Sequence, residues 1–146
     1  MFVDKEIRKT KGQWEGMVIG ALNSHSILVF KKSKFQHNGQ AFELDAATKD
    51  TSGDIIHAVD IKRIEARRDI HKRTDEIVNK GSHLKAAYPK ANFGAVIYYP
   101  FISEHGNVRD RLQSPHIDSV VFAGASRDSV VTAVKLLLGK FKCLKS

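Results

Sequence analysis

The sequence is poor in cysteine, proline and long apolar runs, and each shortage excludes a class of protein. Its single cysteine, Cys143, cannot form an internal disulfide framework or a cysteine-rich metal site, and it fits a reducing compartment. No apolar run approaches the roughly 20 residues needed to cross a bilayer. The first residues are charged and lack the apolar stretch of a secretory signal. We therefore expect a cytoplasmic protein with no membrane partner.

The composition is otherwise that of an ordinary globular chain with a large positive charge. At 146 residues, residues 1–146 form a single domain, either free-standing or the catalytic domain of a larger protein. Lysine and arginine total 24 against 16 acidic residues, a net charge of +8 that attracts polyanions. Six basic residues fall within residues 61–73 (IKRIEARRDIHKR). DNA is therefore the expected partner.

Hydrophobic periodicity predicts the order of helices and strands. The spacing of Trp14, Met17, Val18 and Ala21 indicates a first helix, and β-rich or alternating runs separated by turn residues indicate the strands. We predict helices at about 10–22, 65–88 and 127–138, strands at 26–32, 40–48, 55–61, 93–101 and 117–123, and a polar connection at 104–115. This αβββαβ order, followed by βα, predicts an α/β fold whose mixed sheet is flanked by helices.

Two acids and a lysine in adjacent strands form the candidate catalytic group. Asp60 and Lys62 share one face of their strand, because side chains alternate along a strand. If this strand forms a hairpin with the preceding one, Asp45 comes to lie near Asp60. Two such carboxylates repel each other unless a divalent cation lies between them, and Mg²⁺ binds carboxylates while keeping waters for a phosphate substrate. Lys62 would then orient or help deprotonate the attacking water, or neutralise charge on the phosphate.

This arrangement resembles the PD-(D/E)xK nuclease superfamily, which includes restriction endonucleases and archaeal Holliday-junction resolvases. The resemblance rests on Asp45 in FELDAA, on Asp60-Ile61-Lys62 in AVDIKR and on the element order over residues 10–101. It implies a restriction-endonuclease-like αβββαβ core, with Mg²⁺ (or Mn²⁺ as a substitute) held by Asp45, Asp60 and the Ile61 carbonyl. Glu15 in the first helix matches a glutamate that many members add. Leu44 stands where the family pattern has proline.

The resemblance implies a metal-dependent endonuclease that hydrolyses phosphodiester bonds in DNA. A homodimer would suit cleavage of both strands of a duplex. The alternatives are a non-catalytic nucleic-acid-binding or assembly module with a nuclease-like fold, and a small basic domain for a protein partner. Neither DNA specificity nor biological role follows from the sequence.

The basic segment after the third strand is the candidate DNA-binding surface. Five of its six basic side chains, all except Lys62, are expected to make sequence-independent contacts with the DNA backbone: Arg63, Arg67, Arg68, Lys72 and Arg73. Some of them can also pair with neighbouring acids at helical spacing. Tyr98, Tyr99 and Phe101 are expected to be core and strand-edge residues rather than platforms for nucleobases.

Overall fold

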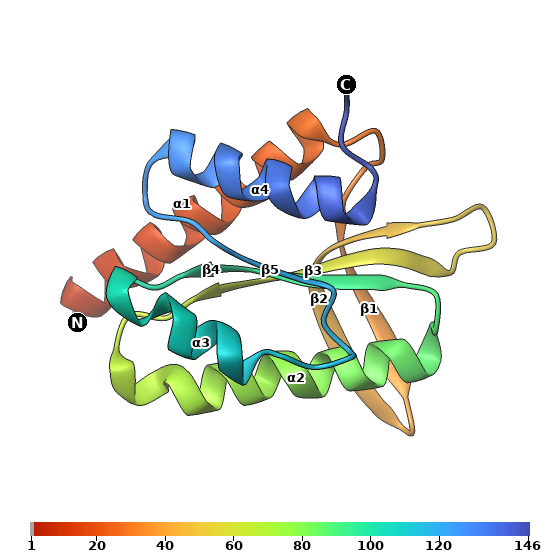
Figure 1. Ribbon diagram of the computed structural model, residues 1–146, viewed down its shortest axis with the longest axis horizontal. Coiled ribbons are helices and arrows are strands. Elements are labelled where there is room, and N and C mark those ends of the chain that lie inside the picture. The colour runs from red at the N-terminus through yellow and green to blue at the C-terminus, as the bar shows by residue number, and fades with distance from the viewer. Residues whose placement is uncertain (1) are drawn as a thin grey trace.

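The chain folds into a five-stranded sheet covered by two helices on each face (Figure 1). The computed structural model describes the backbone of residues 2–146 and the side chains of residues 12–146. The elements in order are α1 (Phe2–His25), β1 (Lys31–His37), β2 (Gln40–Lys49), β3 (Ile55–Arg63), α2 (Ile70–Ala87), β4 (Asn92–Tyr98), α3 (His105–Arg111), β5 (Ser119–Phe122) and α4 (Arg127–Phe141). Short 3₁₀ turns at Arg67–Asp69 and Ile102–Glu104 precede α2 and α3.

The strands lie side by side in chain order, β1-β2-β3-β4-β5. The first three form an antiparallel meander, and β3, β4 and β5 are parallel to one another. A parallel pair needs a crossover, which α2 supplies between β3 and β4. The predicted α/β class with a mixed sheet and flanking helices is confirmed.

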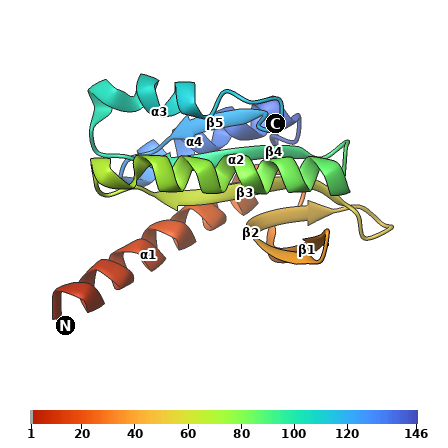
Figure 2. The same ribbon diagram turned by 90° about the horizontal axis from the view of Figure 1, so that it is seen from below.

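Each face of the sheet has its own apolar core. On one face α1 and α4 pack over the side chains of Val59, Ile61 and Val96. On the other, α2 and α3 cover Leu44, Ala58 and their neighbours, with α2 running along the sheet (Figure 2). The opposite directions of Val59 and Asp60 follow from this, since neighbouring residues of β3 point to different faces.

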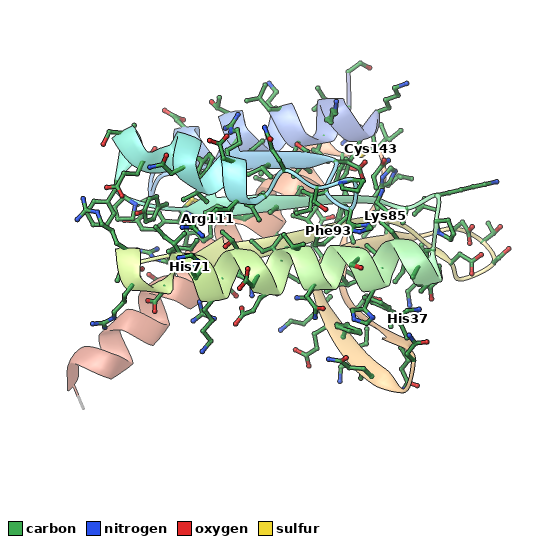
Figure 3. All side chains as sticks on the ribbon, turned by 60° about the horizontal axis from the view of Figure 1, so that its bottom comes forward. His37, His71, Lys85, Phe93, Arg111 and Cys143 are labelled. Carbon is green, nitrogen blue, oxygen red and sulfur yellow. The ribbon has the colours of Figure 1, made fainter. Side chains whose placement is uncertain are left out.

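Gly81 marks the closest approach of α2 to the sheet. A Cβ atom there would lie 2.9 Å from the His116 carbonyl oxygen and 2.9 Å from Cδ2 of Phe93, a ring labelled in Figure 3. We expect Gly81→Ala to lower the free energy of unfolding by about 1–3 kcal/mol, because the backbone must move to admit the methyl group. Urea denaturation measures this. Gly106→Ala, where nothing lies within 4 Å, is the control, and equal stability of the two variants would contradict the packing argument.

The strand predicted at 26–32 is wrong, since β1 begins only at Lys31. The apolar run that suggested it is an irregular connection in which Ile27 and Val29 are 63% and 65% exposed. The Asn23 side chain fixes this connection, accepting a hydrogen bond from the Phe30 amide (2.7 Å) and donating one to its carbonyl (3.1 Å). Because these hydrogen bonds hold the segment against α1, it does not join the sheet, and the more polar β1 is the edge strand.

Other element boundaries differ less from the prediction. The first helix is longer than expected and begins at Phe2, and α4 continues to Phe141. The polar connection at 104–115 contains a helix, α3, whose Val108 is buried. One buried valine in a polar stretch gives no helical periodicity, so the sequence did not indicate this helix. No helix within the described residues is long and apolar enough to cross a membrane.

Candidate active site

A β-bulge in β2 sets the position of Asp45. Lys31 pairs with Ala47 and Ser33 with Leu44, so β2 has one residue more than β1 over this stretch, and both Asp45 and Ala46 oppose Lys32. Bulges bend a strand and redirect its side chains. The paired residues of β2 and β3 begin at Ala46 and Val59. Next to this pair, the Ile61 amide of β3 donates its hydrogen bond to the side chain of Asp45 rather than to a main-chain carbonyl of β2. The distance from the Ile61 nitrogen to Asp45 Oδ2 is 2.7 Å.

Asp60 is fully buried under α2. Its Oδ1 accepts a hydrogen bond from Lys80 Nζ at 3.1 Å. Its Oδ2 lies 3.9 Å from Lys62 Nζ and accepts no hydrogen bond from an N–H group of the described residues, but the Asp45 carboxyl group is close enough to share a proton with Asp60. Two buried carboxyl groups in such contact are costly to ionise together. Because Ala46 pairs with Val59, their neighbours Asp45 and Asp60 come together at this end of the β2–β3 pair. This register supports the prediction that the two acids meet across the hairpin.

Lys62 points to the same face as Asp60, as the alternation predicted. Its Nζ lies 3.2 Å from Glu76 Oε2 on α2. Glu76 in turn accepts hydrogen bonds from Arg73 at 3.3–3.4 Å. Burial alone would raise the pKa of Glu76, but the hydrogen bonds and positive charges of Lys62 and Arg73 outweigh it and lower that pKa. Glu76 thus stays ionised and holds the ammonium group of Lys62 in place.

A small pocket opens above these carboxylates. It has a volume of about 180 Å³ and is lined by Glu15, Asp45, Ile61, Lys62, Arg63 and Arg73. Three of the four residues predicted as catalytic, with the predicted Ile61, line it together, whereas Asp60 is fully buried next to Asp45 and does not line it. Pockets for organic ligands are usually about 300 Å³ or larger, so this one suits a phosphate group with waters better than a buried organic cofactor.

The charges around Asp45 make it difficult to ionise. Burial and the neighbouring carboxyl group of Asp60 raise the pKa of Asp45 to about 7, although the Ile61 amide and the charge of Lys80 lower it in part. Two acids placed this close cannot both ionise without a positive partner. Asp45 is therefore about half protonated at neutral pH, and the proton that it keeps is shared with Asp60.

A divalent cation bound to the two acids would let both ionise, and the donor set fits one. Asp45 and Asp60 supply carboxylate oxygens, and the main-chain carbonyl of Ile61 is an oxygen donor of the kind that Mg²⁺ accepts. Among the described residues no three His, Cys, Asp or Glu side chains are close enough to form a metal cluster. Mg²⁺ suits a site with so few protein ligands, because it binds through one or two carboxylates and keeps its waters.

The predicted DNA-binding residues fall into two groups. Arg68 and Lys72 are exposed. Arg63, Arg67 and Arg73 are paired with acids: Glu65, Glu104 and Glu76. A basic helix missed in the sequence adds to this end of the molecule, since Arg111 of α3 contacts His71 of α2 at 2.7 Å (Figure 3).

Sequence reasoning missed the roles of Glu76 and Lys80. Together with Arg73 they form a stripe on α2 at i, i+3 and i+7, each one residue before a member of the buried stripe Thr74, Ile77 and Gly81. A polar stripe beside an apolar one marks the border of a packed helix face. That border, facing a strand with Asp60 and Lys62, was the signal that could have identified them.

Cys143 and His57 have structural roles in the core. Cys143 is buried in the core of the α1–α4 face, and burial raises the pKa of its thiol. His57 stacks on Phe141, and burial lowers its pKa. A larger pocket between Leu28 and Lys49 has no acidic or histidine side chain in its lining. The pocket lined by Glu15 and Asp45 is the one that contains the predicted catalytic residues.

Comparison with protein-family models, with curated proteins and with solved structures finds no match to this chain. Its function has to be argued from the chemistry of the pocket and from the order of its elements.

Proposed function

We propose that the protein is a metal-dependent endonuclease that hydrolyses phosphodiester bonds in DNA. The observation that supports this best is the small pocket that brings Glu15, Asp45, Ile61 and Lys62 together, with the buried Asp60 next to Asp45. It combines acids, a lysine and arginines in a space of the size of a phosphate group. A net charge of +8 favours a polyanionic substrate.

The fold supports the resemblance to the PD-(D/E)xK nuclease superfamily. The chain begins α1-β1-β2-β3-α2-β4, which is the αβββαβ order that the resemblance implies. The acid of the motif's first half lies on β2, and Asp60-Ile61-Lys62 lies on β3 beside it. This agreement in order and placement is more specific than the short motif alone.

Each residue of the pocket has a distinct task in this proposal. Asp45, Asp60 and the Ile61 carbonyl would hold Mg²⁺, which when bound neutralises charge on the phosphate and lowers the pKa of water. Lys62, oriented by Glu76, places a positive charge where the phosphate gains negative charge. Arg63 and Arg73 line the pocket as donors for phosphate oxygens. Glu15 is positioned to orient a water molecule.

One observation favours the alternative, a DNA-binding or assembly module without turnover. Lys80 Nζ already lies 3.1 Å from Asp60 Oδ1, so a lysine supplies part of the positive charge that a cation would bring. A site neutralised by its own lysines needs no metal. The pKa of Asp45, which stays raised beside Asp60 in spite of Lys80, argues for the metal, because a cation would relieve the repulsion that the lysine leaves.

A cleavage assay decides between the two. Supercoiled, linear and branched DNA would be incubated with the protein in Mg²⁺, Mn²⁺, Ca²⁺ or EDTA. We expect nicked or linear products in Mg²⁺ and Mn²⁺ and none in EDTA. Binding to DNA with no product in any metal would reject the nuclease and favour the module.

A further inference from the structure

The end of the molecule that holds the pocket also presents arginines stacked on aromatic rings. The guanidinium carbon of Arg63 lies 4.1 Å from the ring centre of Tyr98, and that of Arg67 lies 3.7 Å from the ring centre of Phe101. Both pairs lie where β3 and β4 end and the chain turns toward α2 and α3 (Figure 1). Guanidinium groups on aromatic faces are flat surfaces of the kind on which nucleobases stack.

Arg67 is held flat and left open on one side. Its Nε donates a hydrogen bond to Glu104 Oε2 at 2.7 Å, and Glu104 also accepts one from the Tyr99 hydroxyl at 3.2 Å. The Arg67 side chain nevertheless remains 60% exposed. One face of the guanidinium therefore rests on Phe101 while the rest is available to a ligand.

An exposed apolar side chain adjoins this stack. Ile102, next to Phe101, is 78% exposed, more than any other large hydrophobic side chain in the part of the chain that the structure describes. Apolar side chains of this kind serve as wedges that lie against or between bases in DNA complexes. A ring face and an apolar side chain contact the faces of bases rather than phosphates, and base faces are open to such contacts in unpaired strands.

We propose that Arg67, Phe101 and Ile102 form a stacking platform for unpaired nucleobases. The DNA substrate is then a strand that leaves the duplex next to the cut site, as in a fork or flap. This inference rests on the proposed function, because it specifies the form of the DNA that the pocket acts on. It revises the sequence prediction for Phe101, whereas Tyr99 is buried as expected.

The platform and the pocket are continuous. Arg63 lines the pocket and also covers Tyr98, and the Ile64 amide donates a hydrogen bond to the Tyr98 carbonyl at 2.8 Å. Arg67 follows Arg63 by four residues, which span at most about 14 Å of chain. A single strand that stacks on Arg67 can therefore reach the carboxylates within a few nucleotides.

The charge of Arg67 does not explain its placement. Glu104 already pairs with it, so its attraction for phosphate is reduced, whereas stacking through its open face is not. Lysine in its place would keep the charge and lose the plane. That difference allows stacking to be separated from simple attraction.

The test measures DNA binding by fluorescence anisotropy in EDTA, with a forked duplex and a fully paired duplex of equal length. We expect the wild type to bind the fork about tenfold more tightly. Arg67→Lys and Phe101→Leu should remove most of this preference, and Arg127→Lys, an exposed arginine at the start of α4, should keep it. Equal binding of fork and duplex by the wild type would overturn the platform, as would variants that weaken both DNAs alike.

Cleavage by the wild type in Mg²⁺ keeps the two proposals apart. If paired DNA is cut and no fork preference exists, the platform is wrong and the nuclease stands. If no DNA is cut in any metal, the proposed function fails, whatever the binding preference.

Discussion

Replacing Lys62 with alanine is expected to lower the rate of DNA cleavage by about a hundredfold or more. The ammonium group of Lys62 lies 3.2 Å from Glu76 and 3.9 Å from Asp60, and unlike Lys80, which is closer to Asp60, Lys62 lines the pocket. Its loss leaves the phosphate without that charge when negative charge develops on it. DNA binding should stay within about threefold of wild type, because one of many basic residues has been removed. Single-turnover cleavage and anisotropy measure the two effects.

The folded state should survive this substitution. Glu76 keeps Arg73 as a partner and is about one third exposed, so it is not left as a buried lone charge. Lys90→Ala, at the opposite end of α2 from the pocket, is the control for loss of a lysine and should cut DNA at the wild-type rate. Cleavage by Lys62→Ala at more than about a third of the wild-type rate would remove Lys62 from the mechanism.

The strand part of the site could be predicted because a strand has a fixed period of two. Once residues 55–61 were assigned to a strand, Asp60 and Lys62 had to share a face, and the turn before that strand placed Asp45 beside Asp60. The bulge that turns Asp45 toward the Ile61 amide could not be predicted. FELDAAT contains no glycine or other residue that marks an inserted position.

The helix part of the site depends on how α2 is rotated over the sheet. Periodicity identified its buried stripe, yet which polar neighbour of that stripe meets Asp60 is decided by packing against β3 and β4. Lys80 lies 20 residues from Asp60 in sequence, so no local pattern linked them. The wrong strand at residues 26–32 has a related cause. Strand propensity measures how well a side chain fits a half-buried sheet surface, and Ile27 and Val29 remain exposed instead of packing on one.

Asp45→Asn is expected to abolish cleavage and at the same time stabilise the metal-free protein at pH 8. The pKa of Asp45 is raised from 3.8 to about 7 by burial and by Asp60. The folded state therefore holds a proton that the unfolded state releases, and its stability is highest below pH 4 and falls as pH rises toward 7. Asparagine has no charge to bury, and it can still accept the hydrogen bond from the Ile61 amide. Its amide can also donate to Asp60, replacing the hydrogen bond that the protonated Asp45 makes.

The expected gain at pH 8 is on the order of 2–4 kcal/mol, since each unit of pKa shift corresponds to about 1.4 kcal/mol. For a chain of this size that raises Tm by about 5 °C or more at pH 8, while the difference at pH 4 should nearly vanish. Thermal denaturation at the two pH values measures it. Glu43→Gln, two residues away and exposed, is the control and should change Tm at neither pH.

Adding Mn²⁺ in the same experiment separates a metal ligand from a merely strained acid. Ligand binding to the folded state raises Tm, so the wild type should gain stability at pH 8 as the cation offsets the repulsion between Asp45 and Asp60. Asp45→Asn should gain little, because one of the two carboxylates is gone. A variant that is more stable than wild type yet gains as much from Mn²⁺ would show that the acid is strained for another reason. A variant that is less stable at pH 8 would make Asp45 a structural anchor of β3.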